Sequence, residues 1–335
     1  MRTSILLGVL ALAACAAPGP SPEATVHPAR DVQAPASSGF GVLVMAHGGG
    51  PEWDRSVAEA VAPLRGEVPT RLAYGMASPR TLQAALDSLR QDGVTHVAVV
   101  RMFLSGRSFL DQTEYFLGLS DQPPASFLLM DHAEGAHGGA GAAGHAAHGG
   151  ASPAPIEHGL TLATHAYGML ESDEAAQIMR ARAAEISRAP AAESVLLLAH
   201  GMGDEGENDE VLAVMSAIAG SLEHEGFTRV RAATLREDWD EKRAEAEGQI
   251  RTWVAAEAAE GRRVLVLPMR LSGFGPYAEV LEGLSYAPGD GLLPHPAIQG
   301  WIRQTAVRVA CTQGWRTALA PCPHLADDRT ESSPR

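Results

Sequence analysis

The sequence of 335 residues predicts two tandem α/β domains, each a parallel sheet covered by helices. Three observations support this fold class. An apolar run that ends in Ala-His-Gly occurs at 41–50 and again at 195–203, and a run that ends in Leu-Ser-Gly occurs at 102–106 and again at 269–273. In both halves, such runs alternate with segments of helical periodicity, which is typical of βα units. The repeat therefore predicts two halves of the same construction.

Each half contains the residues for four βα units. At the second helix, Ser78 precedes Pro79, and serine favours the N-cap while proline suits the first helical position. In the first half we expect strands at 41–46, 71–76, 96–104 and within 160–169, with helices at 52–64, 79–92, 109–119 and 173–186. In the second half we expect strands at 195–199, 229–235 and 263–271, the segment 292–296 in the place of the fourth, and helices at 208–222, 239–259 and 297–311.

The amino-terminal segment has the features of an export signal. Arg2 precedes an apolar run at 5–14 that is too short to span a bilayer, and Leu12-Ala13-Ala14-Cys15 resembles the bacterial lipobox. We expect a signal peptide at 1–14, cleavage before Cys15 and diacylation of that residue, which gives stable membrane anchoring. Residue 16 is alanine, which favours the outer membrane of the cell envelope where the cell has one.

The net charge and the two remaining cysteines indicate which partners and covalent bonds to expect. The net charge of −14 argues against a nucleic-acid partner, because phosphate binding needs a basic surface. Cys311 and Cys322 are predicted to form a disulfide in an oxidising envelope. The predicted organisation is a flexible linker over 15–39, domains at 40–190 and 191–312, and a tail at 313–335.

His47 and His200 are the candidate site residues. Each follows a predicted parallel strand, and open α/β sheets bind ligands at the carboxyl ends of their strands. The alternative is structural: the glycines permit a tight turn between strand and helix, and the imidazoles cap it.

The order of motifs resembles a known family. A strand that ends in His-Gly, a second before S-P-x-x-x-x-A-L, a third that ends in F-L-S-G and a fourth before an amphipathic helix are similar to the sirohydrochlorin chelatases of the CbiX and SirB type, the class II chelatases. The resemblance covers about 40–312 in two copies and is clearest at 41–119. It implies flavodoxin- or Rossmann-like halves facing a central cleft, in which Co²⁺ or Fe²⁺ enters a sirohydrochlorin-type tetrapyrrole without a nucleotide.

The family's chemistry requires a ligand for the metal ion and a base for two pyrrole N–H protons. A neutral imidazole can do either, and a nearby carboxylate would assist proton removal. The resemblance implies that His47 is the principal ligand and base, with His200 as its partner from the second half.

One family feature is missing. A second histidine is expected after the third strand, but 103–109 and 273–277 contain none. Either His47 and His200 meet across the cleft, or a carboxylate replaces the ligand. Glu114 and Glu279 are equivalent when their helices are aligned, although both could be solvated helix residues. His165 and His295 lie beside the fourth strands and are further candidate ligands, although Pro294-His295-Pro296 could be only a rigid turn.

The segment 131–155 is rich in glycine and histidine and too poor in apolar residues to pack. It is either a low-complexity insertion or an accessory metal loop that collects Ni²⁺, Co²⁺ or Zn²⁺ through imidazoles. Its candidate ligands, with one residue just beyond it, are His132, His137, His145, His148 and His158. The sequence therefore predicts an envelope chelatase, with a non-catalytic metal- or tetrapyrrole-binding lipoprotein as the alternative and a purely structural envelope protein as a third possibility.

Overall fold

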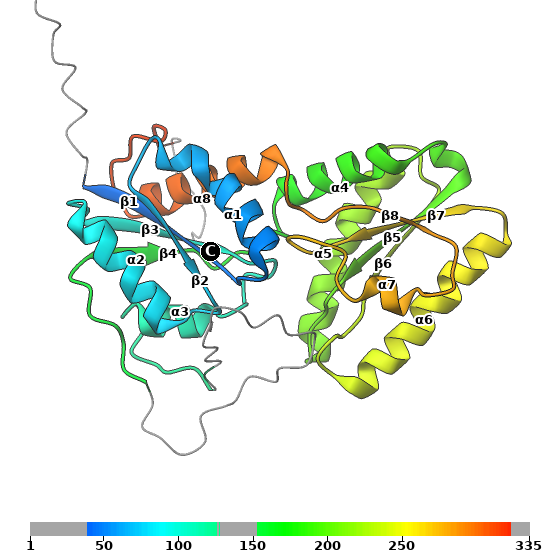
Figure 1. The fold of residues 1–335 in the computed structure, drawn as a ribbon, viewed down its shortest axis with the longest axis horizontal. Helices are drawn as coiled ribbons and strands as arrows, with labels where there is room; N and C mark the ends of the chain where they lie inside the picture. Colours follow the sequence, from blue (N-terminus) through cyan, green and yellow to red (C-terminus); the bar gives the residue numbers. More distant parts are fainter. Residues whose placement is uncertain (1–38, 126, 128–152, 323–335) are drawn as a thin grey trace, which may run out of the picture. The chain divides into compact units, whose positions relative to one another are not determined.

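A computed structural model describes residues 39–125, 127 and 153–322, all within one compact unit (Figure 1). It contains two sheets of four parallel strands, in the orders β2-β1-β3-β4 and β6-β5-β7-β8. The predicted α/β class with two parallel sheets is confirmed. The predicted signal peptide, Cys15 and the histidines at 132, 137, 145 and 148 lie outside the described residues.

The first sheet is built around β1 (Phe40–Ala46), whose seven residues are all buried. This burial explains its continuous apolar run, because helices cover both faces of a parallel sheet. The other elements of this half are β2 (Thr70–Tyr74), β3 (His96–Met102), β4 (Thr161–Thr164), α1 (Pro51–Arg65), α2 (Pro79–Gln91), α3 (Leu110–Phe116) and α4 (Asp173–Ile186).

The second sheet is built in the same way around β5 (Glu193–Ala199). Its other elements are η1 (Pro190–Ala192), β6 (Arg229–Thr234), β7 (Arg263–Pro268), β8 (Ala287–Pro288), α5 (Glu205–Glu223), α6 (Asp240–Ala259), α7 (Tyr277–Val280) and α8 (Pro296–Thr312).

The placement of the last strand corrects the sequence-based prediction. The segment 292–296 is not a strand, because the strand that pairs with β7 lies earlier, at Ala287–Pro288. Leu292 and Leu293 still donate backbone hydrogen bonds to Arg270 and Leu271, at 2.9 and 2.6 Å. The two prolines in the segment lack an N–H, so they cannot extend a ladder of strand hydrogen bonds.

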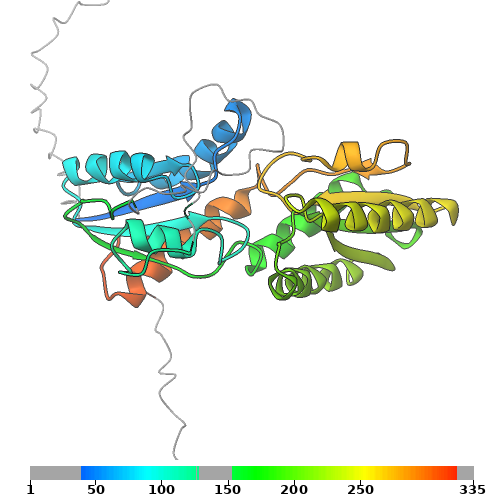
Figure 2. The ribbon, with the colours of Figure 1, turned by 90° about the horizontal axis from the view of Figure 1, so that it is seen from below.

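The last helix of each half packs against the sheet of the other half. Helices α1 and α8 cover one face of the first sheet, and α2 and α3 cover the other (Figures 1 and 2). On the second sheet, α4 and α5 cover one face, and α6 and α7 cover the other. Since α4 also packs against α8, one apolar core runs through both halves.

The carboxyl-terminal segment folds back onto α8. Cys311 and Cys322 form a disulfide, as the sequence predicts. Within the loop that this bond closes, Leu319 is buried, and the ring of Trp315 lies 5.2 Å from that of His96, at the amino end of β3. The disulfide therefore fixes the tail at the edge of the first sheet opposite to His47.

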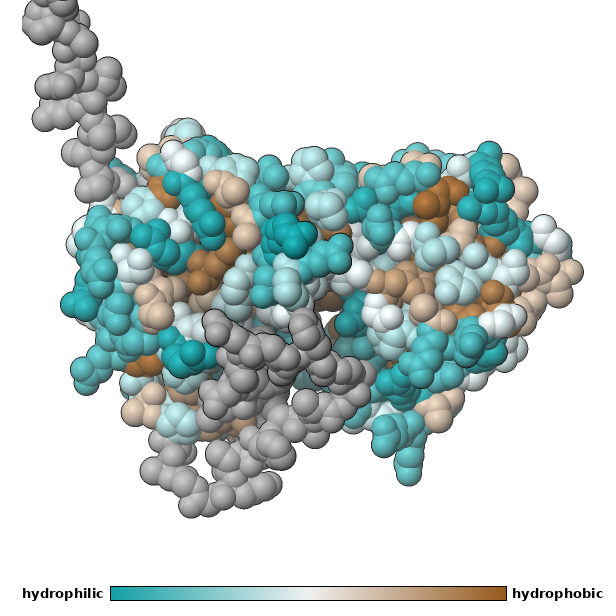
Figure 3. Space-filling view, in the orientation of Figure 1, coloured by the Kyte–Doolittle hydropathy of each residue, from teal (hydrophilic) through white to brown (hydrophobic). Residues whose placement is uncertain are grey.

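The surface carries few large apolar side chains. Leu119, 40% exposed, is the one exposed large hydrophobic residue in the part of the chain that the structure describes. The face in Figure 3 accordingly mixes hydrophilic and neutral residues with small apolar patches. Within the described ranges, no helix is both long and apolar enough to cross a bilayer.

Candidate active site at two Ala-His-Gly turns

The two Ala-His-Gly turns have the same backbone geometry. His47 follows β1 and His200 follows β5, and each of these strands lies between two neighbours of its sheet. The next residues, Gly48 and Gly201, have φ of 85° and 88°, a region where a side chain would be strained. Glycine is thus needed to turn the chain, and the turn leaves the imidazole at the carboxyl edge of the sheet.

A backbone carbonyl orients each imidazole. The Nδ1 atom of His47 lies 2.7 Å from the carbonyl oxygen of Gly48, and that of His200 lies 2.8 Å from the carbonyl oxygen of Gly201. Because a carbonyl can only accept, Nδ1 carries the proton in both rings, and the lone pair of the neutral ring is on Nε2. A metal-binding histidine is usually held in this way, through the ring nitrogen that does not bind the metal.

His200 has a second polar partner that the sequence analysis did not identify. Its Nε2 lies 3.1 Å from Oδ2 of Asp238, in the loop between β6 and α6. The ring of Trp239 meets the imidazole edge to face, with 6.0 Å between centroids. The sequence did contain a signal for Asp238, because this acidic residue comes soon after β6, the neighbour of β5. The carboxyl ends of neighbouring parallel strands lie at the same edge of a sheet.

The loop that carries Asp238 is anchored by charged groups. Arg236, with φ of 57°, donates to the carbonyl oxygen of Gly203 at 3.1 Å and pairs with Glu205 at 3.0 Å. Lys242 binds the same carbonyl and the same carboxylate. Hydrogen bonds from Arg236 and then Lys242 lower the pKa of Glu205 to about 2, so this carboxylate stays ionised and engaged with the loop.

A second charged group lies beside this loop. Arg270 donates to Oε1 of Glu237 at 2.6 Å, and its guanidinium lies 5.7 Å from the ring centroid of Tyr277. Tyr277 is fully buried, and this burial raises the pKa of its phenol. Glu237 is therefore held as the counterion of Arg270 rather than offered to a ligand.

His165 is held inside the first half. It is 6% exposed; its Nε2 accepts from the backbone N–H of Arg101 at 2.9 Å, and its Nδ1 donates to the carbonyl of Tyr167 at 2.8 Å. Burial, reinforced by the charge of Arg101, lowers the pKa of His165 to about 4. A neutral ring with both nitrogens bonded to the backbone has no lone pair for a metal, so this arrangement corrects its assignment as a candidate ligand.

Arg101 fixes the loops that follow β3 and β4. Its side chain is 1% exposed and donates to the carbonyls of His165, Gly106 and Ser108 at 2.6–2.8 Å. Burial lowers its pKa to about 10, against the opposing charges of Glu114, Asp111 and Glu171. It therefore remains a cation at neutral pH, and it holds the carboxyl edge of the first sheet rigid.

The other predicted site residues lie in separate surroundings. Nδ1 of His295 accepts from the backbone N–H of Ala297 at 3.2 Å and caps α8, and burial followed by the charge of Arg182 lowers its pKa. Glu279 is exposed on α7, whereas Glu114 is half-buried on α3, near enough for its charge to act on Arg101. Both ring nitrogens of His158 contact backbone groups, of Leu160 at 3.0 Å and Leu117 at 3.2 Å.

These residues do not form one metal cluster. Among the described residues, no three His, Cys, Asp or Glu side chains are placed to hold a metal ion together.

Residues of both halves line a narrow hollow beside α5, where Arg107 pairs with Glu210 at 3.1 Å and lies 4.0 Å from Glu207.

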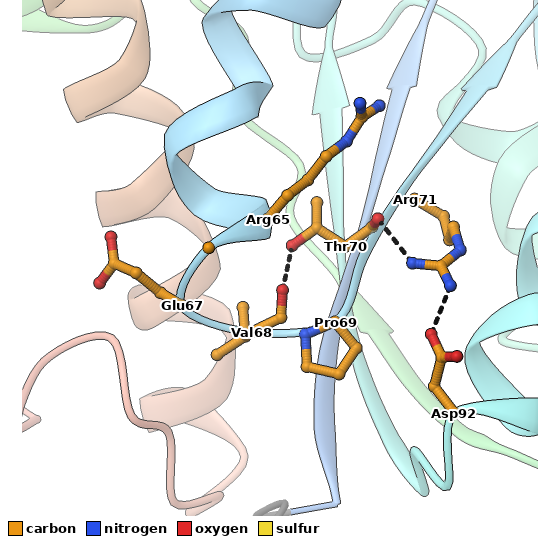
Figure 4. Close-up of a pocket in the computed structure, with 8 residues that line it drawn as sticks. Arg65, Glu67, Val68, Pro69, Thr70, Arg71 and Asp92 are labelled. Atoms are coloured by element: carbon orange, nitrogen blue, oxygen red, sulfur yellow. Dashed lines mark hydrogen bonds and ion pairs between the residues drawn. The ribbon is translucent and has the colours of Figure 1, made fainter. Parts of the chain in front are cut away.

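A larger hollow, of about 610 Å³, lies near the amino end of β2, at the edge of the first sheet opposite to His47. Arg71, which bonds to Asp92 and to the carbonyl of Thr70, lies on its wall (Figure 4). This hollow is therefore not part of the two histidine turns, which lie at the carboxyl edges of the sheets.

Two solved structures share the fold of the described chain. No protein-family model and no curated protein matches the chain. SirB from Bacillus subtilis with Fe³⁺ aligns with a TM-score of 0.55 and 13% identity, and sirohydrochlorin chelatase SirB from Bacillus subtilis subspecies spizizenii in complex with cobalt aligns with 0.51 and 11%. Both alignments cover 83% of this chain and 98% of the other. The chain has a chelatase-like fold.

Proposed function

We propose that this protein is a chelatase that inserts a divalent metal ion, Co²⁺ or Fe²⁺, into a sirohydrochlorin-type tetrapyrrole. One observation carries the proposal. In each half of a chelatase-like fold, an imidazole at the carboxyl end of a central strand is oriented through Nδ1 by a backbone carbonyl.

The orientation suits metal insertion. Because Nδ1 of His47 contacts the carbonyl of Gly48, Nε2 is the ring nitrogen that would bind the incoming ion, and imidazole is a suitable ligand for cobalt and iron. Insertion forms bonds from the metal to the pyrrole nitrogens and releases two N–H protons, so a base must lie at the same edge. Glu114 and Glu279 remain predicted assistants, and Ni²⁺ or Zn²⁺ are alternative substrates.

Substitution of His47 tests the proposal. We expect His47→Ala to weaken Co²⁺ binding, followed by its visible absorbance, and to abolish insertion into sirohydrochlorin under anaerobic conditions. His224→Ala is the matched control, because His224 is exposed at the end of α5 and its Nδ1 also contacts a backbone carbonyl, that of Gly220, at 2.8 Å. Unchanged binding and insertion by His47→Ala would show that the site lies elsewhere.

We also propose that the protein is attached to the cell envelope through a lipid at Cys15, in the lipobox-like sequence at 12–15. Acylation adds about 0.8 kcal/mol of membrane affinity per buried methylene, so two chains anchor a protein stably. In cell fractionation, Cys15→Ser should move the protein from the membrane to the soluble fraction. An unchanged distribution would refute the anchor.

A further inference from the structure

Trp239 lies beside the second histidine turn and does not serve the apolar core. Of the five tryptophans in the chain, Trp301 is buried in the core shared by the two halves, and Trp53, Trp253 and Trp315 pack against core clusters. Trp239 is partly exposed and belongs to none of the core clusters of the described chain. A large aromatic side chain that is not used for packing is an informative exception, because an indole gains stability when its ring is covered.

A glycine fixes the position of this indole. If residue 203 had a side chain, its Cβ would lie 2.4–2.6 Å from three atoms of the Trp239 ring. Gly203 belongs to the turn of His200, so the missing side chain lets the ring settle against the backbone of that turn. The same ring meets the imidazole of His200 at 88° between planes, with 6.0 Å between centroids. Trp239 therefore borders the candidate site directly.

The segment that carries Trp239 is held rigid from both sides. Arg236 and Lys242 both donate to the carbonyl oxygen of Gly203, at 3.1 and 2.6 Å, and both pair with Glu205. The backbone N–H of Trp239 also donates to the carbonyl of Arg236, at 3.1 Å. Because the segment is tied to the turn before and after Trp239, the indole is preorganised, and a ligand that contacts it loses little affinity in ordering it.

We infer that Trp239 is a substrate-binding residue that stacks on the planar conjugated ring of the tetrapyrrole. This inference rests on the proposed chelatase function and names the part of the substrate that the second half recognises. A conjugated tetrapyrrole presents a flat π surface, and aromatic side chains stack on such surfaces whatever substituents the ring carries. The carboxylate substituents need charged or polar partners, whereas the ring needs an aromatic surface of this kind.

Binding of the metal-free substrate tests the inference without requiring catalysis. We expect Trp239→Leu to raise the Kd for metal-free sirohydrochlorin, followed anaerobically by its absorbance shift, about 5- to 100-fold, as loss of one stacking contact does for a planar base. Trp239→Phe should keep the Kd within about threefold of the original, because it retains an aromatic face. Trp253→Leu is the matched control, since Trp253 is also a partly buried tryptophan of the second half. An unchanged Kd in Trp239→Leu, or an equal rise in Trp239→Phe, would overturn the inference.

A second variant displaces the indole without removing it. In Gly203→Ala the added methyl group would overlap the ring of Trp239, so the ring has to move. We expect the Kd for metal-free sirohydrochlorin to rise by about threefold or more, because the stacking surface is shifted. Gly220→Ala, on α5, is the matched control, because its added Cβ would have no neighbour within 4 Å. A Kd that Gly203→Ala leaves unchanged would also overturn the inference.

Kinetics separate substrate binding from the reaction. Because stacking on the ring is the same before and during insertion, Trp239→Leu should raise KM for sirohydrochlorin about 5- to 100-fold and leave kcat within about threefold of the original. Co²⁺ affinity should stay within about twofold, because an indole is not a metal ligand. A fall in kcat with an unchanged KM would mean that Trp239 acts on the reaction and not on substrate binding, and would overturn the inference.

The two proposals fail in different ways. If the unmodified protein does not bind sirohydrochlorin, both fail. If it binds sirohydrochlorin but does not accelerate insertion, the proposed function fails, and the Kd of Trp239→Leu still decides the inference. If insertion is catalysed and depends on His47, but neither Kd nor KM responds to Trp239→Leu, the inference alone fails.

Discussion

At the scale of single residues, the surroundings of a histidine decide what it can do. Four histidines, His47, His165, His200 and His295, were predicted as candidate ligands from their place beside strands, and they have different partners. His47 and His200 lie at the turns, whereas His165 is buried with both nitrogens bonded to backbone groups. The sequence predicted the two turns because their pattern repeats. It could not distinguish His165, because the group that occupies its Nε2, the backbone N–H of Arg101, lies on another strand.

His165 makes the stability of the protein depend on pH. Its pKa falls from 6.5 in the unfolded chain to about 4 in the folded protein, so the unfolded state binds more protons as the pH falls below 6.5. From this group alone, the free energy of unfolding should decrease by about 2 kcal/mol between pH 7 and pH 5. In urea titrations, His165→Asn should lack this component, whereas His224→Ala should keep it. Equal pH dependence in all three proteins would contradict this account.

At the scale of elements, periodicity predicted most helices and strands but not their partners. The predicted helix at 173–186 coincides with α4, because its apolar spacing and the cap at Ser172 mark its bounds. The last strand was missed because β8 consists of two residues, too few to form a pattern. Periodicity also shows that a helix has a buried face, but it does not show which sheet covers that face. It therefore could not predict that α4 and α8 each pack against the sheet of the other half.

The disulfide stabilises the end of α8. It closes a short loop, with a sequence separation of 11, that holds Leu319 in the core. Such a loop contributes about 3 kcal/mol, mainly by restricting the unfolded chain. The double substitution Cys311→Ala and Cys322→Ala should lower the free energy of urea unfolding by about this amount and leave metal insertion unchanged, because the loop lies at the edge opposite to His47. As a control, the double variant should be as stable as the original protein after its disulfide has been reduced. If the double variant is as stable as the oxidised original protein, the disulfide does not stabilise α8.

At the scale of the whole molecule, the exchanged helices make the two halves of the described chain interdependent. The core that contains Val44 of β1 and Leu197 of β5 also contains Trp301 of α8. The repeat in the sequence predicted two similar halves, and the structure confirms two similar sheets. That one core serves both follows from contacts far apart in the sequence, which spacing alone cannot reveal.

This shared core predicts a single unfolding transition. Trp301 is 3% exposed, and its ring lies 5.9 Å from that of His165. Trp301→Ala should cost about 3–5 kcal/mol, as other large-to-small core substitutions do, while circular dichroism and fluorescence should still report one coincident transition in urea. The partly buried Trp253, replaced in the same way, is the control for which we expect a smaller loss. Two separated transitions would show that the halves unfold independently.

The central claim is that the protein catalyses metal insertion at the histidine turns. Its most direct test is the anaerobic absorbance change of sirohydrochlorin with Co²⁺ or Fe²⁺, using the protein from residue 16 onward and a control without protein. We predict an initial rate that exceeds the control and is proportional to protein concentration. A rate equal to that of the control would contradict the claim and would indicate that the chelatase-like fold serves binding without catalysis.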